Sequence, residues 1–218
     1  MKRLIETLVL TALLVGFARL LYVSKSINFI REYYATIFAV TFIYVPVMVM
    51  WFKHQPIDFV DSSLRMFFRS LRVFIGTALV IFPVYILCAH FWMIHVFGRT
   101  TLLVAPYPNL LKTILFQTLL IALPEEFFFR GYMQATLDKS FIKRWNIFGT
   151  RLGWAWIITA LVFAASHSFV RFQWWHFSIF FPALVFGWLR ERTNSITAPV
   201  LFHAASNIIA DWVAKSYF

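Results

Sequence analysis

Two glutamates and one arginine stand in the middle of an apolar stretch, where ionisable residues are rare. The stretch runs Leu123-Pro-Glu-Glu-Phe-Phe-Phe-Arg-Gly131, and its charged residues are Glu125, Glu126 and Arg130. One such group inside a membrane helix costs about 2.5–3.5 kcal/mol, so three together require a structural or chemical reason. The chemical reason would be acid–base catalysis, since a carboxylate beside an imidazole can activate a water molecule.

Helical spacing separates the roles of these three residues. Glu126 and Arg130 are four residues apart, so they share a helix face in the favourable acid-before-base order. Glu125 lies about 100° around the helix from Glu126, so it points elsewhere. We therefore predict a structural Glu126–Arg130 ion pair and a Glu125 side chain left for chemistry. Desolvation makes an unpaired carboxylate more basic, and Pro124 should bend the helix where water can enter.

Two further apolar segments carry imidazoles. His167 ends the run Phe163-Ala-Ala-Ser-His167, and a second run, His203-Ala-Ala-Ser-Asn207, puts a histidine and an asparagine four residues apart. Residues at that spacing lie on one face of a helix. A single histidine near a helix end is more often a packing or interfacial residue than a catalyst, and the small residues between His203 and Asn207 also suit close helix packing.

The depth of these residues favours a shared site. Glu125 is 13 residues before Asp138, and His167 is 14 residues after Gly153. At 1.5 Å per residue, both lie roughly 20 Å from the connection between their segments. His203 and Asn207 lie roughly 12–18 Å from Ser195 on the same scale. We expect three helices to bring these groups together.

Long helices must position these residues, because the chain is too apolar for an ordinary soluble domain. Of its 218 residues 61% are hydrophobic and 13% are charged, against roughly 25% charged in an average soluble domain. A bilayer-spanning helix needs about 20 apolar residues, and open strands would leave backbone groups unsatisfied in lipid. Seven stretches approach that length: Leu4–Val23, Tyr33–Phe52, Arg72–Phe97, Leu110–Leu137, Trp154–Val170, Trp174–Leu189 and Ile196–Ala214. The prediction is an all-α polytopic transmembrane helix bundle.

The bundle should form a single membrane domain over residues 1–218. Residues 1–108 supply the N-terminal spans, and residues 109–214 supply the catalytic helix core. Between the second and third spans, charged residues recur at three- and four-residue spacing among aromatic ones, so Gln55–Leu71 is predicted to be an interfacial amphipathic helix. Two prolines in Val104–Asn109 predict a turn before the fourth span.

The distribution of basic residues predicts orientation. The formal net charge is +11, but Lys and Arg stand between apolar blocks, which favours anionic lipid as the partner and argues against nucleic acid. Twelve of them lie in connections on the N-terminal side and five on the other, with Arg19, Lys112 and Arg130 in or beside spans. An integral protein of the cell (inner) membrane with a cytoplasmic N-terminus is expected. Trp174 and Trp175 are typical of the aromatic belt at a membrane interface.

The chain resembles the CPBP family, the CAAX proteases and bacteriocin-processing enzymes also called the Abi or type II CAAX prenyl endopeptidase family. The resemblance covers about Leu110 to Asp211. Three motifs carry the resemblance: Glu125-Glu126-x-x-x-Arg130, Phe163-x-x-x-His167 and His203-x-x-x-Asn207. A further stretch, Gly187–Ser195 followed by Ala198-Pro199, resembles the one that precedes the family's last histidine.

The resemblance implies an intramembrane glutamic endopeptidase with seven to eight spans. It implies that Glu125 and His167 activate a water, that His203 and Asn207 form an oxyanion hole, and that Glu126 and Arg130 support them. The implied substrate is a membrane-anchored or lipidated protein or peptide: a prenylated CAAX tail, a bacteriocin leader or a sorting signal. No cofactor and no metal are expected.

Three alternatives stay open at this point. Glu125, His167 and His203 could be ligands of a catalytic zinc, although no His-Glu-x-x-His helix is present; full activity in strong chelator would dispose of zinc. Buried charges also mark transporters and channels, which would show electrogenic flux without peptide cleavage. A non-catalytic scaffold or immunity protein would keep its cellular activity after Glu125→Gln.

Overall fold

The computed structural model describes residues 2–218, and these are mostly helical. The longest helices are α1 Lys2–Val23, α2 Asn28–Phe52, α3 Leu64–His95, α7 Trp154–Val170, α8 Phe180–Thr193 and α9 Thr197–Ser216. Between α3 and α7 a further continuous helix covers 110–138, made of α4 Leu110–Phe116, α5 Leu123–Glu126 and α6 Ala135–Asp138 with wider turns between them. Short 3-10 turns, Ser24–Ser26 and Trp174–Ile179, follow α1 and precede α8.

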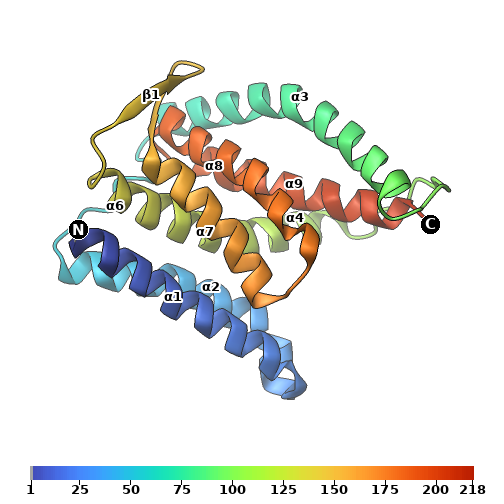
Figure 1. The fold of residues 1–218 in the computed structure, drawn as a ribbon, viewed down its shortest axis with the longest axis horizontal. Coiled ribbons are helices and arrows are strands. Elements are labelled where there is room, and N and C mark those ends of the chain that lie inside the picture. Colours follow the sequence, from blue (N-terminus) through green and yellow to red (C-terminus); the bar gives the residue numbers. More distant parts are fainter. Residues whose placement is uncertain (1) are drawn as a thin grey trace.

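The helices pack as one bundle around the helix 110–138. In Figure 1, α1 and α2 form an antiparallel pair along one side, and α3 curves along the opposite side. The α1–α2 pair packs against α7 and α5, while α3 packs against α9 and α8. Helices far apart in sequence therefore surround the segment that carries Glu125.

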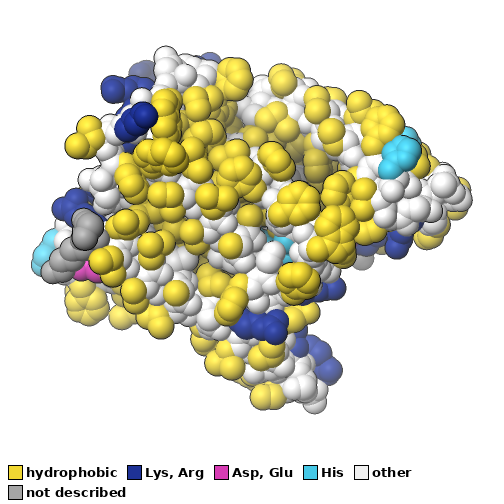
Figure 2. Space-filling view, in the orientation of Figure 1, with side chains coloured by type: hydrophobic (Ala, Val, Ile, Leu, Met, Phe, Trp, Pro, Cys, Tyr) yellow, Lys and Arg dark blue, Asp and Glu magenta, His cyan; other side chains and the backbone are white. Residues whose placement is uncertain are grey.

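The outer surface is apolar, as expected of a membrane protein. Three helical segments are long and apolar enough to cross a membrane, Arg3–Ser26, Asn28–Phe52 and Leu64–His95, and α7 is a shorter apolar helix. Large apolar side chains point outward, including Leu79 at 73% and Val80 at 70% exposure, and hydrophobic side chains cover much of the face in Figure 2. The helical and transmembrane class is confirmed, whereas seven to eight spans stays a prediction.

The helix predicted over Gln55–Leu71 is present only in its second half. Residues 55–63 are irregular, and α3 begins only at Leu64, where the Ser63 hydroxyl caps it by accepting from the Met66 N–H at 3.3 Å. The reason is a tertiary contact: Phe59 is buried, and its carbonyl accepts from the Ile196 N–H at 2.9 Å. That contact holds Phe59 in the core, and the residues before Leu64 stay irregular.

A β-hairpin corrects the all-helical prediction. Strands β1 Arg144–Ile147 and β2 Thr150–Gly153 pair antiparallel between the helix 110–138 and α7. Their turn, Phe148-Gly149, has positive φ at both residues, 49° and 73°, as two-residue hairpin turns require. The hairpin lies outside the apolar stretches, so its open edges need no shielding from lipid.

Pro124 lies where the helix 110–138 departs from α-helical geometry. Gln117–Ala122 before it and Phe127–Gln134 after it are π-helical. Proline has no N–H to donate, and π turns are rare features that often occur at functional sites. The predicted disruption around Pro124 therefore takes the form of widened turns on both sides of Glu125 and Glu126.

Gly131→Ala should destabilise the bundle by about 1–3 kcal/mol, the usual effect of overpacking a core. A Cβ at Gly131 would lie 2.4 Å from the Phe59 ring, and both residues are buried. The measurement is the loss of helical signal on heating in detergent. Gly76→Ala in α3 is the matched control, because nothing lies within 4 Å of its Cβ. Equal stability of the two variants would contradict the close approach.

Candidate active site

Glu125 lies between two imidazoles from different helices. Its Oε2 is 3.7 Å from His167 Nε2 on α7 and 3.9 Å from His203 Nε2 on α9. Both distances exceed a direct hydrogen bond, and this buried oxygen has no hydrogen-bond partner among the described residues. A water molecule among the three groups would satisfy them all. The structure thus brings together Glu125, His167 and His203.

Glu126 faces away from Glu125, into the core. Its Oε1 accepts from Arg130 Nη1 at 3.0 Å, and both side chains have 0% exposure, so the predicted ion pair is present. Arg130 Nη2 also donates to the Ala183 carbonyl at 3.3 Å, and the guanidinium lies 4.2 Å from the Phe163 ring centroid. The pair ties the helix 110–138 to α7 and α8.

The same carboxylate holds His203. Glu126 Oε1 lies 2.8 Å from His203 Nδ1. A carboxylate paired with arginine is ionised and can only accept, so Nδ1 carries a proton and donates it. The imidazole is thereby fixed with its Nε2 toward Glu125, and Glu126 positions a histidine as well as pairing with Arg130.

His167 is oriented by its own helix. Its Nδ1 lies 2.9 Å from the Phe163 carbonyl oxygen one turn earlier. A carbonyl only accepts, so Nδ1 carries the proton, and in the neutral ring Nε2 presents a lone pair toward Glu125. The spacing Phe163-x-x-x-His167 therefore has a physical role, because the carbonyl at the first position sets the tautomer at the second.

Asn207 lies one helical turn beyond His203 and is held by Gln117. Asn207 Nδ2 donates to Gln117 Oε1 at 3.0 Å, linking α9 to the π-helical turn before Pro124. Sequence reasoning missed Gln117, although a glutamine in an apolar stretch eight residues before Glu125 was a visible signal.

A cavity of about 280 Å³ opens onto Glu125 and His167 from the side of α1 and α2. It is mostly apolar, and its polar lining comes from Tyr22, Lys25, Tyr34, Glu125, Ser166, His167, Arg171 and His176. His176 has its ring centroid 6.2 Å from that of His167. Through this cavity a ligand can reach the Glu125 carboxylate and the His167 imidazole.

The fold and this cluster define a helical membrane protein with a buried carboxylate–imidazole site. Residues 107–209 match the family model described as type II CAAX prenyl endopeptidase Rce1-like. The resemblance seen in the sequence motifs is confirmed, and the match indicates an intramembrane protease. Comparison with curated proteins and with solved structures gave no match.

The geometry gives the zinc alternative no support. Within residues 2–218, no group of three His, Cys, Asp or Glu side chains is arranged to hold a metal ion. Retention of activity in strong chelator is still the direct test of zinc dependence.

Proposed function

We propose that this protein is a glutamate-dependent intramembrane endopeptidase that hydrolyses a peptide bond in a membrane-associated substrate. The observation that carries the proposal is the unpartnered Glu125 oxygen, held within 4 Å of two imidazoles at the end of a cavity. Because no described side chain hydrogen-bonds this oxygen, it is available to take a proton from a water molecule. The family-model match over residues 107–209 supports the same reaction class.

In the proposed reaction Glu125 and His167 activate one water molecule. The water donates one hydrogen bond to Glu125 Oε2 and the other to the lone pair on His167 Nε2, so its oxygen points toward the substrate carbonyl. Glu125 takes a proton as the carbon–oxygen bond forms. The same proton then passes to the amide nitrogen as the carbon–nitrogen bond breaks, which releases an amine and a carboxylic acid and restores the glutamate.

His203 and Asn207 would stabilise the tetrahedral oxyanion. His203 Nδ1 already donates to Glu126, so its Nε2 can donate only in the imidazolium form. That form leaves the buried cluster neutral, with the charges of Arg130 and His203 balancing those of Glu125 and Glu126. When Glu125 takes a proton its negative charge moves to the oxyanion, so no net charge is added to a low-dielectric site.

Asn207→Ala should lower turnover by about a hundredfold or more, the usual effect of removing one oxyanion donor. Gln117→Ala should lower it by about tenfold with KM unchanged, because the Asn207 amide would lose its orienting acceptor but not its N–H groups. In the Asn207→Ala background, Gln117→Ala should have no further effect. Additive losses in the double variant would contradict the positioning role of Gln117.

The expected substrate carries its scissile bond near a lipid anchor or a membrane segment, since the cavity lies within the apolar bundle. With the N-terminus cytoplasmic, as the distribution of Lys and Arg favours, the cavity would open toward the external leaflet, because its lining comes from the C-terminal half of α1. Anionic lipid around the basic connections is the proposed environment.

The test is a comparison of protein fragments in cells that carry either the native protein or Glu125→Ala. New C-termini and N-termini that appear only with the native protein would identify both the reaction and its substrate. An identical fragment set in the two strains, with equal protein levels in the membrane, would overturn the proposal.

A further inference from the structure

A third imidazole lines the cavity beside Glu125. His176 lies in the 3-10 turn Trp174–Ile179, on the connection between α7 and α8, and it borders the same cavity as Glu125 and His167. Its ring centroid is 6.2 Å from that of His167. The proposed hydrolysis assigns roles to Glu125, His167, His203 and Asn207 and leaves His176 unused.

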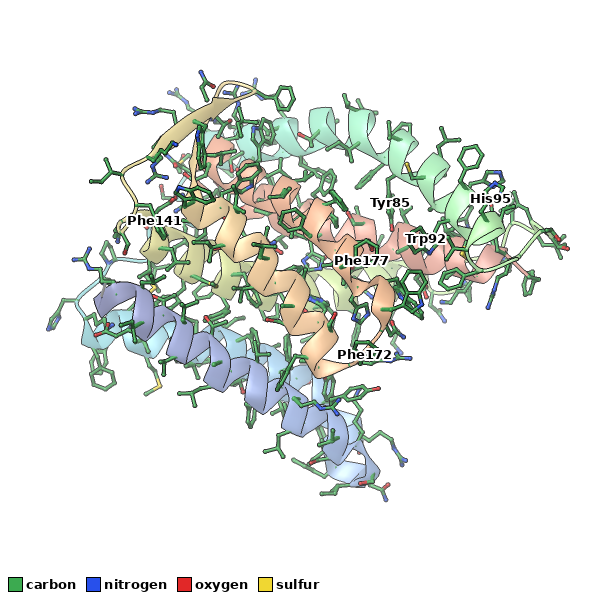
Figure 3. The ribbon with its side chains drawn as sticks, in the orientation of Figure 1. Tyr85, Trp92, His95, Phe141, Phe172 and Phe177 are labelled. Atoms are coloured by element: carbon green, nitrogen blue, oxygen red, sulfur yellow. The ribbon has the colours of Figure 1, made fainter. Side chains whose placement is uncertain are left out.

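Aromatic contacts with α3 and the residues after it hold this turn in place. Trp174 packs against Trp92 with ring centroids 5.7 Å apart, and Trp175 packs against Phe97 at 5.4 Å. Figure 3 labels Trp92 at this end of α3. A 3-10 turn has three residues per turn, so successive side chains point about 120° apart. While the two tryptophans pack toward α3, the next side chain, that of His176, is directed toward α7.

The ring of His176 has a nitrogen without a partner. Its Nδ1 is shielded from solvent, and no described residue forms a hydrogen bond with it. Lys25 and Arg171 line the same cavity, and their positive charges favour the neutral imidazole. In the neutral ring with the proton on Nε2, Nδ1 carries a lone pair. His176 can therefore accept a hydrogen bond from a ligand in the cavity.

The cavity offers a bound peptide more donors than acceptors near the reacting groups. Lys25 and Arg171 can only donate. In the proposed reaction, Glu125 and the lone pair of His167 both accept from the attacking water. Each residue of a peptide other than proline brings one N–H as well as one carbonyl, and an N–H without an acceptor is unfavourable in an apolar cavity. His176 is the acceptor that remains beside His167.

The position of His176 relates its hydrogen-bond partner to the cleaved bond. His167 holds the attacking water in the proposed reaction, and the ring centroids of His167 and His176 are 6.2 Å apart. An extended peptide advances about 3.3 Å per residue. The N–H that reaches His176 therefore belongs to a residue within about two positions of the cleaved bond.

We propose that His176 Nδ1 accepts a hydrogen bond from a backbone N–H of the substrate and so holds the cleaved bond in register with Glu125 and His167. The inference rests on the proposed function and deepens it, because it makes His176 a substrate-positioning residue. It also sets a requirement on the substrate. One residue near the cleaved bond must have a backbone N–H, which excludes proline at that position.

The test measures binding without hydrolysis. Glu125→Gln protein in phosphatidylcholine nanodiscs is mixed with random palmitoylated decapeptides in which each backbone nitrogen carries either a hydrogen or a methyl group. Mass spectrometry of the bound peptides gives the methylated fraction at each position, counted from the palmitoyl group. Methylation removes the donor and keeps the side chain. At one position the bound peptides should be depleted in methyl about tenfold relative to the starting mixture, the effect of losing one buried hydrogen bond.

His176→Phe, in that background, should abolish the depletion. Phenylalanine keeps an aromatic ring beside Trp175, whose centroid is 6.4 Å from that of His176, but it has no nitrogen. His176→Leu should give the same result, whereas His176→Asn should retain the depletion because its amide oxygen can accept in place of Nδ1. His95→Leu should retain it too. This matched control changes an exposed histidine outside the cavity lining, labelled near the end of α3 in Figure 3.

Two results would overturn the inference. If no position were depleted in methyl among the bound peptides, the substrate N–H would have no acceptor at His176. If the depletion persisted in both His176→Phe and His176→Leu, the methyl group would be excluded by its size alone.

Failure of this inference can be told apart from failure of the proposed function, because the binding assay uses protein that cannot hydrolyse. Depletion that depends on His176, with identical fragment sets in cells carrying the native protein and Glu125→Ala, would overturn the peptidase proposal alone. Fragments that appear only with the native protein, without any depletion that depends on His176, would overturn the N–H contact alone.

Discussion

Glu125→Gln should lower peptide hydrolysis by about 10²–10⁴-fold, the contribution typical of a general base. Glutamine keeps the shape of the side chain and its acceptor oxygen, but it cannot take a proton from water. Glu125 has no ion-pair partner within hydrogen-bond distance in the described chain, and His167 and His203 lie 3.7 and 3.9 Å away. Stability should therefore change little, so the lost turnover can be assigned to chemistry. The measurement is turnover of the substrate found by fragment analysis, with protein in lipid vesicles.

The matched control is Glu32→Gln, which removes the same charge from an exposed position on α2. Its turnover should equal that of the unsubstituted protein. If Glu125→Gln retained more than about a tenth of the activity, general-base catalysis by this residue would be excluded. If it lost activity together with thermal stability, Glu125 would be a structural residue, and the proposal would fail for a different reason.

The sequence predicted those parts of the site that depend on spacing within one helix. The four-residue interval between Glu126 and Arg130 placed them on one face, and their ion pair is present at 3.0 Å. Depth counting placed Glu125 and His167 at one level, and the structure brings them within 4 Å. Both inferences require only the geometry of a helix and a count of residues from the connection between two neighbouring helices.

The parts that were not predicted depend on which helices become neighbours. Gln117 reaches Asn207 because α9 packs beside the π-helical turn that carries Gln117. Lys25 lines the cavity beside Glu125 because the turn after α1 packs near the end of α7. The amphipathic pattern of Gln55–Leu71 describes local propensity, but burial of Phe59 in the bundle overrides it. None of these contacts can be predicted from the spacing of residues within one helix.

Arg130→Met should destabilise the protein by about 3–5 kcal/mol, because it leaves the buried Glu126 charge without its guanidinium. Arg130 has 0% exposure, donates to both Glu126 and the Ala183 carbonyl, and lies against the Phe163 ring. The methionine fills much of the space but replaces none of these bonds. The measurement is the unfolding midpoint in detergent, compared with Arg31→Met at an exposed position of α2, where little change is expected.

Adding Glu126→Gln to Arg130→Met should restore part of the lost stability, because no unpaired charge then remains in the core. Activity should not return with it. His203 Nδ1 would face a neutral amide instead of the carboxylate now 2.8 Å away, so the imidazolium that the oxyanion requires would lose its counter-charge. Recovery of both stability and turnover would mean that Glu126 serves only to neutralise Arg130. Recovery of stability alone would separate the two tasks of this carboxylate, because the ion pair holds the helices together while the bond to His203 prepares the site for chemistry.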